Sequence, residues 1–249
     1  MKLRYQTDNG IGTKATLGVI VLQTDETLEP EFARIMNIDG VALYHSRIPM
    51  STEVQPDTLM QMKDDLPAAA ALFPSAPEFD VIGYGCTSAA TVIGPKGVRD
   101  AVHTVLPGVQ VTDPLSAIIA GCNALGAKRV GFVTPYVPDV SARMRTRLEE
   151  AGKEIAAFGS FEQSDDRVVA RIDESSILAA IETVAGQAEC DAIILSCTNL
   201  RSADLVMRAE ARVGVPVISS NLALAWHMLT LAGARKKTND LGALFARAD

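Results

Sequence analysis

The sequence has few of the features that mark nucleic-acid-binding or membrane proteins. Lys and Arg together number 23 against 30 Asp and Glu, and the resulting net charge of −7 argues against a nucleic-acid partner. No apolar run approaches the roughly 18 residues of a membrane span, and the polar residues 1–14 hold no apolar signal core. We therefore expect a cytoplasmic protein with neither a nucleic-acid nor a membrane partner.

Cysteine and histidine are also scarce. The chain has four cysteines and three histidines in 249 residues, and no two cysteines have the C-x-x-C spacing of a zinc site. A disulfide framework and a His-built metal centre are therefore not expected, and a reducing compartment would keep the thiols free. We expect no metal and no cofactor.

Buried strand patterns alternate with helical patterns along the chain, which predicts an α/β fold with parallel sheets. The pattern begins again at Pro114, and the two halves resemble each other in sequence. We predict two similar Rossmann-like (flavodoxin-like) domains related by a pseudo-twofold axis, with the active site in the cleft between them. The first domain comprises residues 1–113 plus 218–249, and the second comprises residues 114–217.

Two stretches are built alike, FDVIGYGCTS at 79–88 and CDAIILSCTN at 190–199. In each, a buried strand is followed by Cys-Thr and then by an expected helix. Open parallel sheets bind ligands at the carboxyl ends of their strands, and a helix N-terminus there favours a thiolate. We predict that Cys86 and Cys197 face each other across one active site. Cys122 and Cys190 lack this context and are interpreted as structural.

These paired Cys-Thr elements, the segment VLQTDETLEPEF at 21–32 and Thr134-Pro135-Tyr136 resemble the Asp/Glu racemase superfamily. The chain is most similar to the branch of maleate cis-trans isomerase and arylmalonate decarboxylase. Around residues 23–27 it is also similar to the ectoine-utilisation proteins of that branch. The resemblance covers nearly the whole chain. It implies a homo-oligomer that acts on a small carboxylic-acid substrate without a cofactor.

The resemblance implies several reactions at two cysteines. In racemases one thiolate removes the α-proton and the opposite thiol delivers another. In maleate isomerase a thiolate adds to the alkene, the new single bond rotates, and elimination gives fumarate. Arylmalonate decarboxylases have glycine at the first cysteine position, so Cys86 argues against that activity. By analogy with maleate isomerase, Cys86 is the initial nucleophile or base and Cys197 is the proton donor.

The substrate-binding residues follow from the same reasoning. An α-carbanion is an enediolate whose oxygens need fixed donors, and hydroxyl and backbone N–H groups beside the cysteines supply them. Tyr136 matches the family tyrosine that donates to a substrate carboxylate, and two residues match the loop that closes on the substrate's other end. The full set is Leu22, Gln23, Asp25, Thr87, Ser88, Tyr136, Thr198 and Asn199.

Asp25 departs from the maleate isomerase pattern, in which this loop reads Ser-Asn-Thr and the asparagine contacts a carboxylate. An ionised Asp25 would repel a substrate carboxylate by roughly 4 kcal/mol at 4 Å and an effective dielectric of 20. It suits an ammonium group, as in the amino-acid racemases of the superfamily, and predicts an amino-acid-like substrate. Alternatively, Asp25 caps the first helix. Arg167 is a candidate compensating cation, and Glu31 is expected in an exposed first helical turn.

Two further functions stay open. The chain could be a clamshell that binds a small acid without turning it over, although two nucleophilic thiols would be a liability for such a protein. It could also be a decarboxylase that tolerates Cys86. Thiol titration and CO2 release from a malonate derivative distinguish these functions from an isomerase.

Overall fold

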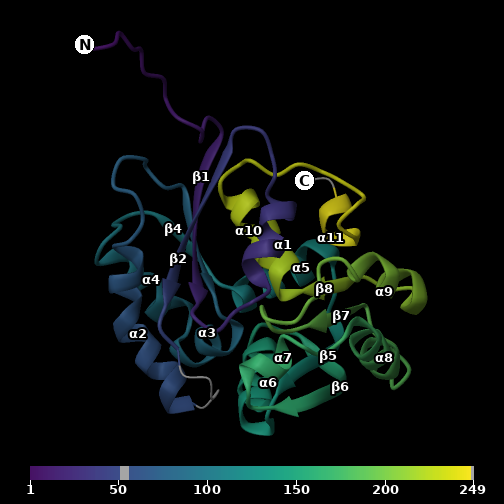
Figure 1. Ribbon diagram of the computed structural model, residues 1–249. Coiled ribbons are helices and arrows are strands. Elements are labelled where there is room, and N and C mark those ends of the chain that lie inside the picture. The colour runs from purple at the N-terminus through teal and green to yellow at the C-terminus, as the bar shows by residue number, and fades with distance from the viewer. Residues whose placement is uncertain (51–55, 248–249) are drawn as a thin grey trace.

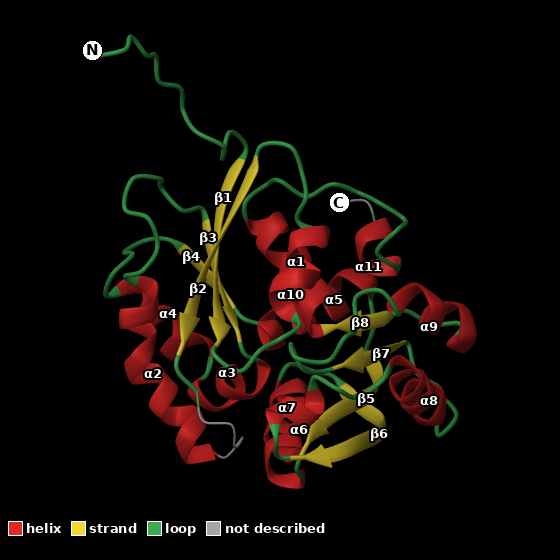
Figure 2. Cartoon of the chain, viewed as in Figure 1, coloured by secondary structure: helices red, strands yellow, loops and turns green. Residues whose placement is uncertain are grey.

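The computed structural model, which describes residues 1–50 and 56–247, contains two four-stranded parallel sheets (Figures 1 and 2). The first sheet has the order β2-β1-β3-β4 and the second has the order β6-β5-β7-β8. The two orders are the same once the numbering is shifted by four, and both match the start of the flavodoxin-like order. The predicted α/β fold with two similar units is therefore confirmed. The strands are β1 (Ala15–Leu22), β2 (Val41–Ile48), β3 (Val81–Gly85), β4 (Gln110–Thr112), β5 (Arg129–Tyr136), β6 (Glu154–Gln163), β7 (Ala192–Leu195) and β8 (Val217–Ser219).

Helices connect the parallel strands and cover the sheets, so β1, β3 and β7 are buried along their whole length. In the first half they are α1 (Leu28–Ile35), α2 (Pro56–Ala70), α3 (Thr87–Ile93), α4 (Pro95–His103) and α5 (Pro114–Leu125). In the second half they are α6 (Pro138–Glu150), α7 (Asp166–Val169), α8 (Glu174–Ala185), α9 (Val206–Val213), α10 (Ser220–Leu231) and α11 (Ala243–Ala246).

Helix α10 joins the two halves. It follows β8 of the second sheet, yet it packs against α1, α5, β3 and β4 of the first half (Figure 1). Gly83 of β3 allows this approach, because a Cβ there would lie 2.6 Å from Sδ of Met228. The exact division of the chain into 1–113 plus 218–249 and 114–217 stays a prediction.

The polar residues 1–14 form an exposed arm without helix or strand, which projects from the amino end of β1 (Figure 1). Within the described ranges 1–50 and 56–247, no helix has both the length and the hydropathy needed to span a membrane.

Candidate active site

Cys86 lies at the carboxyl end of β3 and is the N-cap residue of α3. Its Sγ accepts a hydrogen bond from the Ala89 N–H at 3.3 Å and lies 3.5 Å from Oγ of Ser88. The preceding Gly85 has a packing role, because a Cβ there would lie 2.7 Å from Cδ1 of Leu28. The start of α1 therefore lies over the end of β3 and helps to bury Cys86, which is 1% exposed.

Cys197 follows β7 but does not start a helix. The chain continues as an irregular loop until α9, so the expectation of a helix directly after Cys197 is wrong. Its φ of 133° lies in a region that residues with side chains rarely adopt. Two hydrogen bonds hold this conformation: the Cys197 N–H donates to Oγ of Ser220 at 3.0 Å, and Sγ accepts from the Asn199 N–H at 3.3 Å.

The structure brings the two cysteine loops together. The Thr198 hydroxyl donates to the Gly85 carbonyl at 3.3 Å, and the hydroxyls of Thr87 and Ser220 lie 3.1 Å apart. Tyr136 is buried at the end of β5, and burial raises the pKa of its phenol, with smaller contributions from the charges of Cys197 and Cys86. A hydrogen bond from the Tyr136 hydroxyl in turn lowers the pKa of Cys197.

Burial dominates the ionisation of both thiols. It raises the pKa of Cys86 to about 11, against the smaller lowering effects of Ser88 and the Ala89 N–H. It raises the pKa of Cys197 further, and the charge of Asp166 adds to that effect. The local backbone does favour both thiolates, as expected, but the cost of desolvating the anions is larger, so the pKa of each thiol is raised.

Asp25 bonds to the backbone just before α1, and its side chain lies near that of Thr198. Its Oδ1 accepts from the backbone N–H groups of Thr27 and Leu28 at 2.8 and 2.7 Å, just before α1. Its side chain is 2% exposed, and burial raises its pKa to about 6. The Thr198 hydroxyl is close enough to lower that pKa but donates to Gly85. Oδ2 of Asp25 is buried and has no hydrogen-bond partner within the described residues.

Asp166 is a site residue that the sequence analysis missed. It is 3% exposed at the start of α7, and its Oδ2 accepts from the Thr24 hydroxyl at 2.6 Å. Its charge raises the pKa of Asp25 and of both catalytic candidates, Cys86 and Cys197. The signal was present: Asp166 follows β6, which pairs with β5, and Tyr136 ends β5. The carboxyl-end rule used for the cysteines would have selected it.

Asn199, Arg167 and the loop at 22–23 serve other contacts. The Asn199 amide is committed within the protein, because Oδ1 accepts from the Glu26 N–H at 2.9 Å and Nδ2 donates to the Asp166 carbonyl at 3.0 Å. Arg167 is exposed and pairs with Asp165 at 2.7 Å, so its interpretation as a compensating cation in the site is wrong. Leu22 is buried at the end of β1, and Gln23 is exposed.

Glu31 is buried rather than exposed, which corrects the expectation for the first turn of α1. Its carboxylate accepts from the N–H groups of Ser202 and Ala203 at 2.8 and 3.0 Å, and from Nδ2 of Asn221 at 2.7 Å. The Asn221 amide also donates to the Thr198 carbonyl at 2.8 Å. Glu31 therefore ties the loop that follows Cys197 to α1 and α10.

Comparisons with known proteins identify the family of this chain. The family profile described as arylmalonate decarboxylase matches residues 98–245. The maleate isomerase of Nocardia farcinica is 30% identical over 225 residues, which cover 86% of this chain and 88% of the relative. This chain belongs to the maleate isomerase and arylmalonate decarboxylase family. The arylmalonate decarboxylase of Bordetella bronchiseptica is 31% identical over 131 residues, which cover 52% of this chain and 55% of the relative.

Solved structures of this family have the same fold. A cysteine-to-serine mutant of the Nocardia farcinica maleate cis-trans isomerase, with a covalently bound succinylcysteine intermediate, matches with a TM-score of 0.83 and 25% identity. The match covers 93% of this chain and 98% of that one. A maleate isomerase of Pseudomonas putida with maleate also has a TM-score of 0.83, at 25% identity, and covers 93% of this chain and 97% of that one. The family is one of isomerases and decarboxylases, so this chain is an enzyme of the superfamily.

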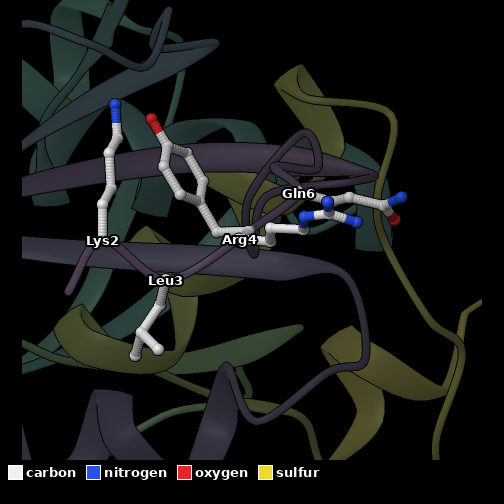
Figure 3. A pocket seen from close by; sticks show the side chains of 5 residues that line it. Lys2, Leu3, Arg4 and Gln6 are labelled. Atoms are coloured by element: carbon white, nitrogen blue, oxygen red, sulfur yellow. The ribbon is translucent and has the colours of Figure 1, made fainter.

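One pocket of the molecule lies outside the candidate active site. Figure 3 shows that it is lined by residues 2–6 of the exposed arm. The arm leaves the amino end of β1, whereas both cysteines follow the carboxyl ends of parallel strands. Within the part of the chain that the structure describes, no cluster of three or more His, Cys, Asp or Glu side chains is arranged to hold a metal ion.

Proposed function

We propose that this enzyme is a cofactor-independent isomerase or racemase that acts on a small carboxylic acid through Cys86 and Cys197. The observation that supports it is the direct hydrogen bonding between two loops that each carry a buried thiol and follow equivalent strands, β3 and β7, of two equivalent sheets. Two thiols in one desolvated site suit proton transfer on opposite faces of one carbon. The covalent succinylcysteine in the Nocardia farcinica enzyme supports cysteine chemistry in this fold.

In the proposed reaction one cysteine is a thiolate and the other a thiol. The thiolate of Cys86 removes the substrate α-proton, and the C–H electron pair becomes part of an enediolate. The thiol of Cys197 then donates its proton to the opposite face, so that Cys86 ends as thiol and Cys197 as thiolate. Cys86 is assigned as the initial thiolate because its pKa is raised less than that of Cys197, so it loses its proton more readily.

Backbone N–H groups supply donors for the enediolate oxygens. Within the described residues, the N–H groups of Thr87, Ser88 and Thr198 make no hydrogen bond to protein. Those of Thr87 and Ser88 are in the first turn of α3, where the helix dipole adds a positive potential. Such fixed donors stabilise negative charge as it develops, without reorganisation.

Thiolate addition to a double bond is the second candidate, because the relatives matched over most of this chain are maleate isomerases. In that reaction Cys86 forms a C–S bond, Cys197 protonates the adjacent carbon, and reversal after bond rotation expels the thiolate. Decarboxylation is less favoured, since Cys86 occupies the position where the family resemblance places glycine in decarboxylases.

The test replaces each cysteine of the site with serine and measures the turnover of a defined panel of candidate substrates in D2O by proton NMR. The panel contains maleate, phenylmalonate and α-amino acids of both configurations. For the member that wild type turns over, Cys86→Ser and Cys197→Ser should each lower turnover by at least about a hundredfold, in line with loss of a general base or acid. Cys190→Ser, a half-buried cysteine outside the site, is the matched control.

Full activity in either site variant, with an unchanged circular dichroism spectrum, would refute the two-thiol mechanism. Deuterium in the recovered substrate supports racemisation, fumarate from maleate supports isomerisation, and loss of CO2 supports decarboxylation. Binding of a panel member without any turnover would instead support a binding protein.

A further inference from the structure

Two carboxyl groups, Asp25 and Asp166, lie in the same buried site as the two thiols. Asp25 is 2% exposed and Asp166 is 3% exposed, and the charge of Asp166 raises the pKa of Asp25. They come from the two halves of the molecule, one after β1 and one after β6. Thr24 connects them, because it precedes Asp25 in the chain and its hydroxyl donates to Asp166 at 2.6 Å.

The protein supplies no cation to this pair. Within residues 1–50 and 56–247, no ion pair joins an Arg, Lys or His to Asp25 or Asp166. The nearby arginines have other partners: Arg47 pairs with Glu29 and donates to the backbone carbonyls of Leu22, Gln23 and Asp25. Arg167 pairs with Asp165, and Arg171 pairs with Glu26, in both cases at the exposed surface.

Oδ2 of Asp25 is the part of this arrangement that indicates a ligand. Oδ1 is fully used by the N–H groups of Thr27 and Leu28, whereas Oδ2 is buried without a hydrogen-bond partner in the described structure. A buried acceptor without a donor is costly, and such groups are usually satisfied by a ligand or water. A donor carried by the substrate would satisfy this oxygen.

We propose that the substrate of this enzyme carries a protonated nitrogen, which binds between Asp25 and Asp166, so that the substrate class is an amino acid rather than a dicarboxylic acid. This inference rests on the proposed function, because it concerns the same site. An ammonium group has three N–H donors and a full positive charge. It would donate to Oδ2 of Asp25 and to Asp166 while its charge offsets the repulsion between the two carboxylates.

The same nitrogen would also assist the chemistry. Burial is the main cause of the raised pKa of Cys86, and the charges of Asp166 and Asp25 add to it, which disfavours the thiolate that proton abstraction needs. A bound ammonium would offset this added contribution of the two carboxylates and so make the thiolate of Cys86 easier to form when the substrate is bound. A dicarboxylate such as maleate would add negative charge beside two carboxyl groups and would disfavour it further.

The experiment compares pairs of probes that differ by one ammonium group: aspartate with succinate, glutamate with glutarate, and alanine with propionate. The amino acids are used in both configurations, EDTA is present throughout, and affinity is measured by isothermal titration calorimetry on the full chain. Wild type should bind at least one amino acid more tightly than its partner acid. Asp25→Asn and Asp166→Asn should each reduce that preference at least about tenfold, as expected for loss of a charge-assisted hydrogen bond.

The asparagine substitutions keep the contacts that fold the loops, since an amide oxygen still accepts from Thr27, Leu28 and Thr24. Asp165→Asn is the control, because it removes a charge from the same loop but faces Arg167 at the surface and should leave the preference unchanged. The inference is overturned if no amino acid binds more tightly than its partner acid, or if the preference survives both site substitutions.

The outcome separates this inference from the proposed function. Turnover of maleate that requires both cysteines, without any preference for ammonium, would leave the function standing and refute the inference. A preference for ammonium-bearing ligands, in a protein whose Cys86→Ser and Cys197→Ser variants keep full turnover, would support the inference and refute the two-thiol function.

Discussion

The Thr198 hydroxyl donates to the carbonyl oxygen of Gly85 at 3.3 Å, so the residue after one cysteine is hydrogen-bonded to the residue before the other. The two residues are 113 positions apart in the chain, and they belong to different sheets: Gly85 is the last residue of β3, and Thr198 follows β7. A threonine that could have been a local helix cap therefore connects the two halves of the active site. The relative placement of the two sulfurs depends on contacts of this kind.

Replacing Thr198 with valine should test that connection. Thr198→Val keeps the shape but leaves the buried Gly85 carbonyl without its donor, which typically costs about 1–3 kcal/mol. We expect a lower free energy of unfolding in urea and a turnover reduced by about tenfold or more. Thr198→Ser retains the hydroxyl and should stay close to wild type, and equal losses in the two variants would contradict the role of the hydrogen bond.

Ser220 should behave as a positioning residue for Cys197. Its Oγ accepts from the Cys197 N–H and lies 3.1 Å from the Thr87 hydroxyl. Ser220→Ala should lower kcat about tenfold or more with little change in KM, because it frees the strained loop that holds the thiol. Thr230→Ala is the control, since that hydroxyl bonds only within α10 to the Trp226 carbonyl. A larger effect on KM than on kcat would indicate a substrate contact instead.

The backbone of Cys197 predicts an inverted order of stability for two substitutions. With φ at 133°, Cys197→Gly should be more stable than Cys197→Ala by roughly 1 kcal/mol or more, because glycine relieves the strain. Within α5 the opposite order is expected, with Cys122→Ala more stable than Cys122→Gly by about 1 kcal/mol. Urea unfolding of the four variants measures both differences. The same order at both sites would show that the φ value carries no strain.

Glu31 should make the protein less stable as the pH rises. Burial raises its pKa from 4.5 to about 7, so between these values the native state holds a proton that the unfolded state has lost. The free energy of unfolding therefore falls over this window, by up to roughly 3 kcal/mol from this group. Glu31→Gln removes that dependence and keeps an oxygen acceptor for Ser202 and Ala203. Relative to wild type, the variant should thus gain stability from pH 4.5 to 7.

The control for this pH effect is Glu29→Gln, because Glu29 is in the same turn of α1 but pairs with Arg47 near the surface. If the free energy of unfolding changed with pH in the same way for wild type and Glu31→Gln between pH 4.5 and 7, the raised pKa of Glu31 would be contradicted. Guanidinium unfolding at several pH values provides the measurement.

Thiol labelling should distinguish the cysteines in the ligand-free enzyme. Burial raises the pKa of Cys86 to about 11 and that of Cys197 further, so both should react slowly with iodoacetamide at pH 8. Cys190 is half-buried and should be labelled first. Mass spectrometry of the digested protein gives the order, and rapid labelling of Cys86 without ligand would show that its thiolate forms in the empty site.

Much of the fold could be read from local patterns. The buried strand patterns and the recurrence at Pro114 predicted two parallel-sheet units, and both sheets have the same strand order. The identity of the catalytic candidates followed from position, since Cys86 and Cys197 come at the carboxyl ends of such strands. Asp166 obeys the same rule but was missed because no recognisable motif surrounds it.

The local sequence patterns predicted the burial of two charged side chains incorrectly. Glu31 looked like an exposed residue of a helical first turn, yet it is 4% exposed and bonded to the loop after Cys197. Arg167 looked available to the site, yet it pairs with its neighbour Asp165. Charge and helical position did not indicate which side of the helix or loop meets the other half of the molecule.

The amino-acid sequence by itself determined the strand-Cys-Thr units and their duplication, because strand and turn preferences act over a few neighbouring residues. The tertiary structure alone decided that Asp25 and Asp166 lie close enough to the thiols to raise their pKa values, and that burial raises those values further. The reason is physical: pKa and pairing depend on desolvation and on charges a few ångströms away, and here those charges come from residues about 140 positions apart.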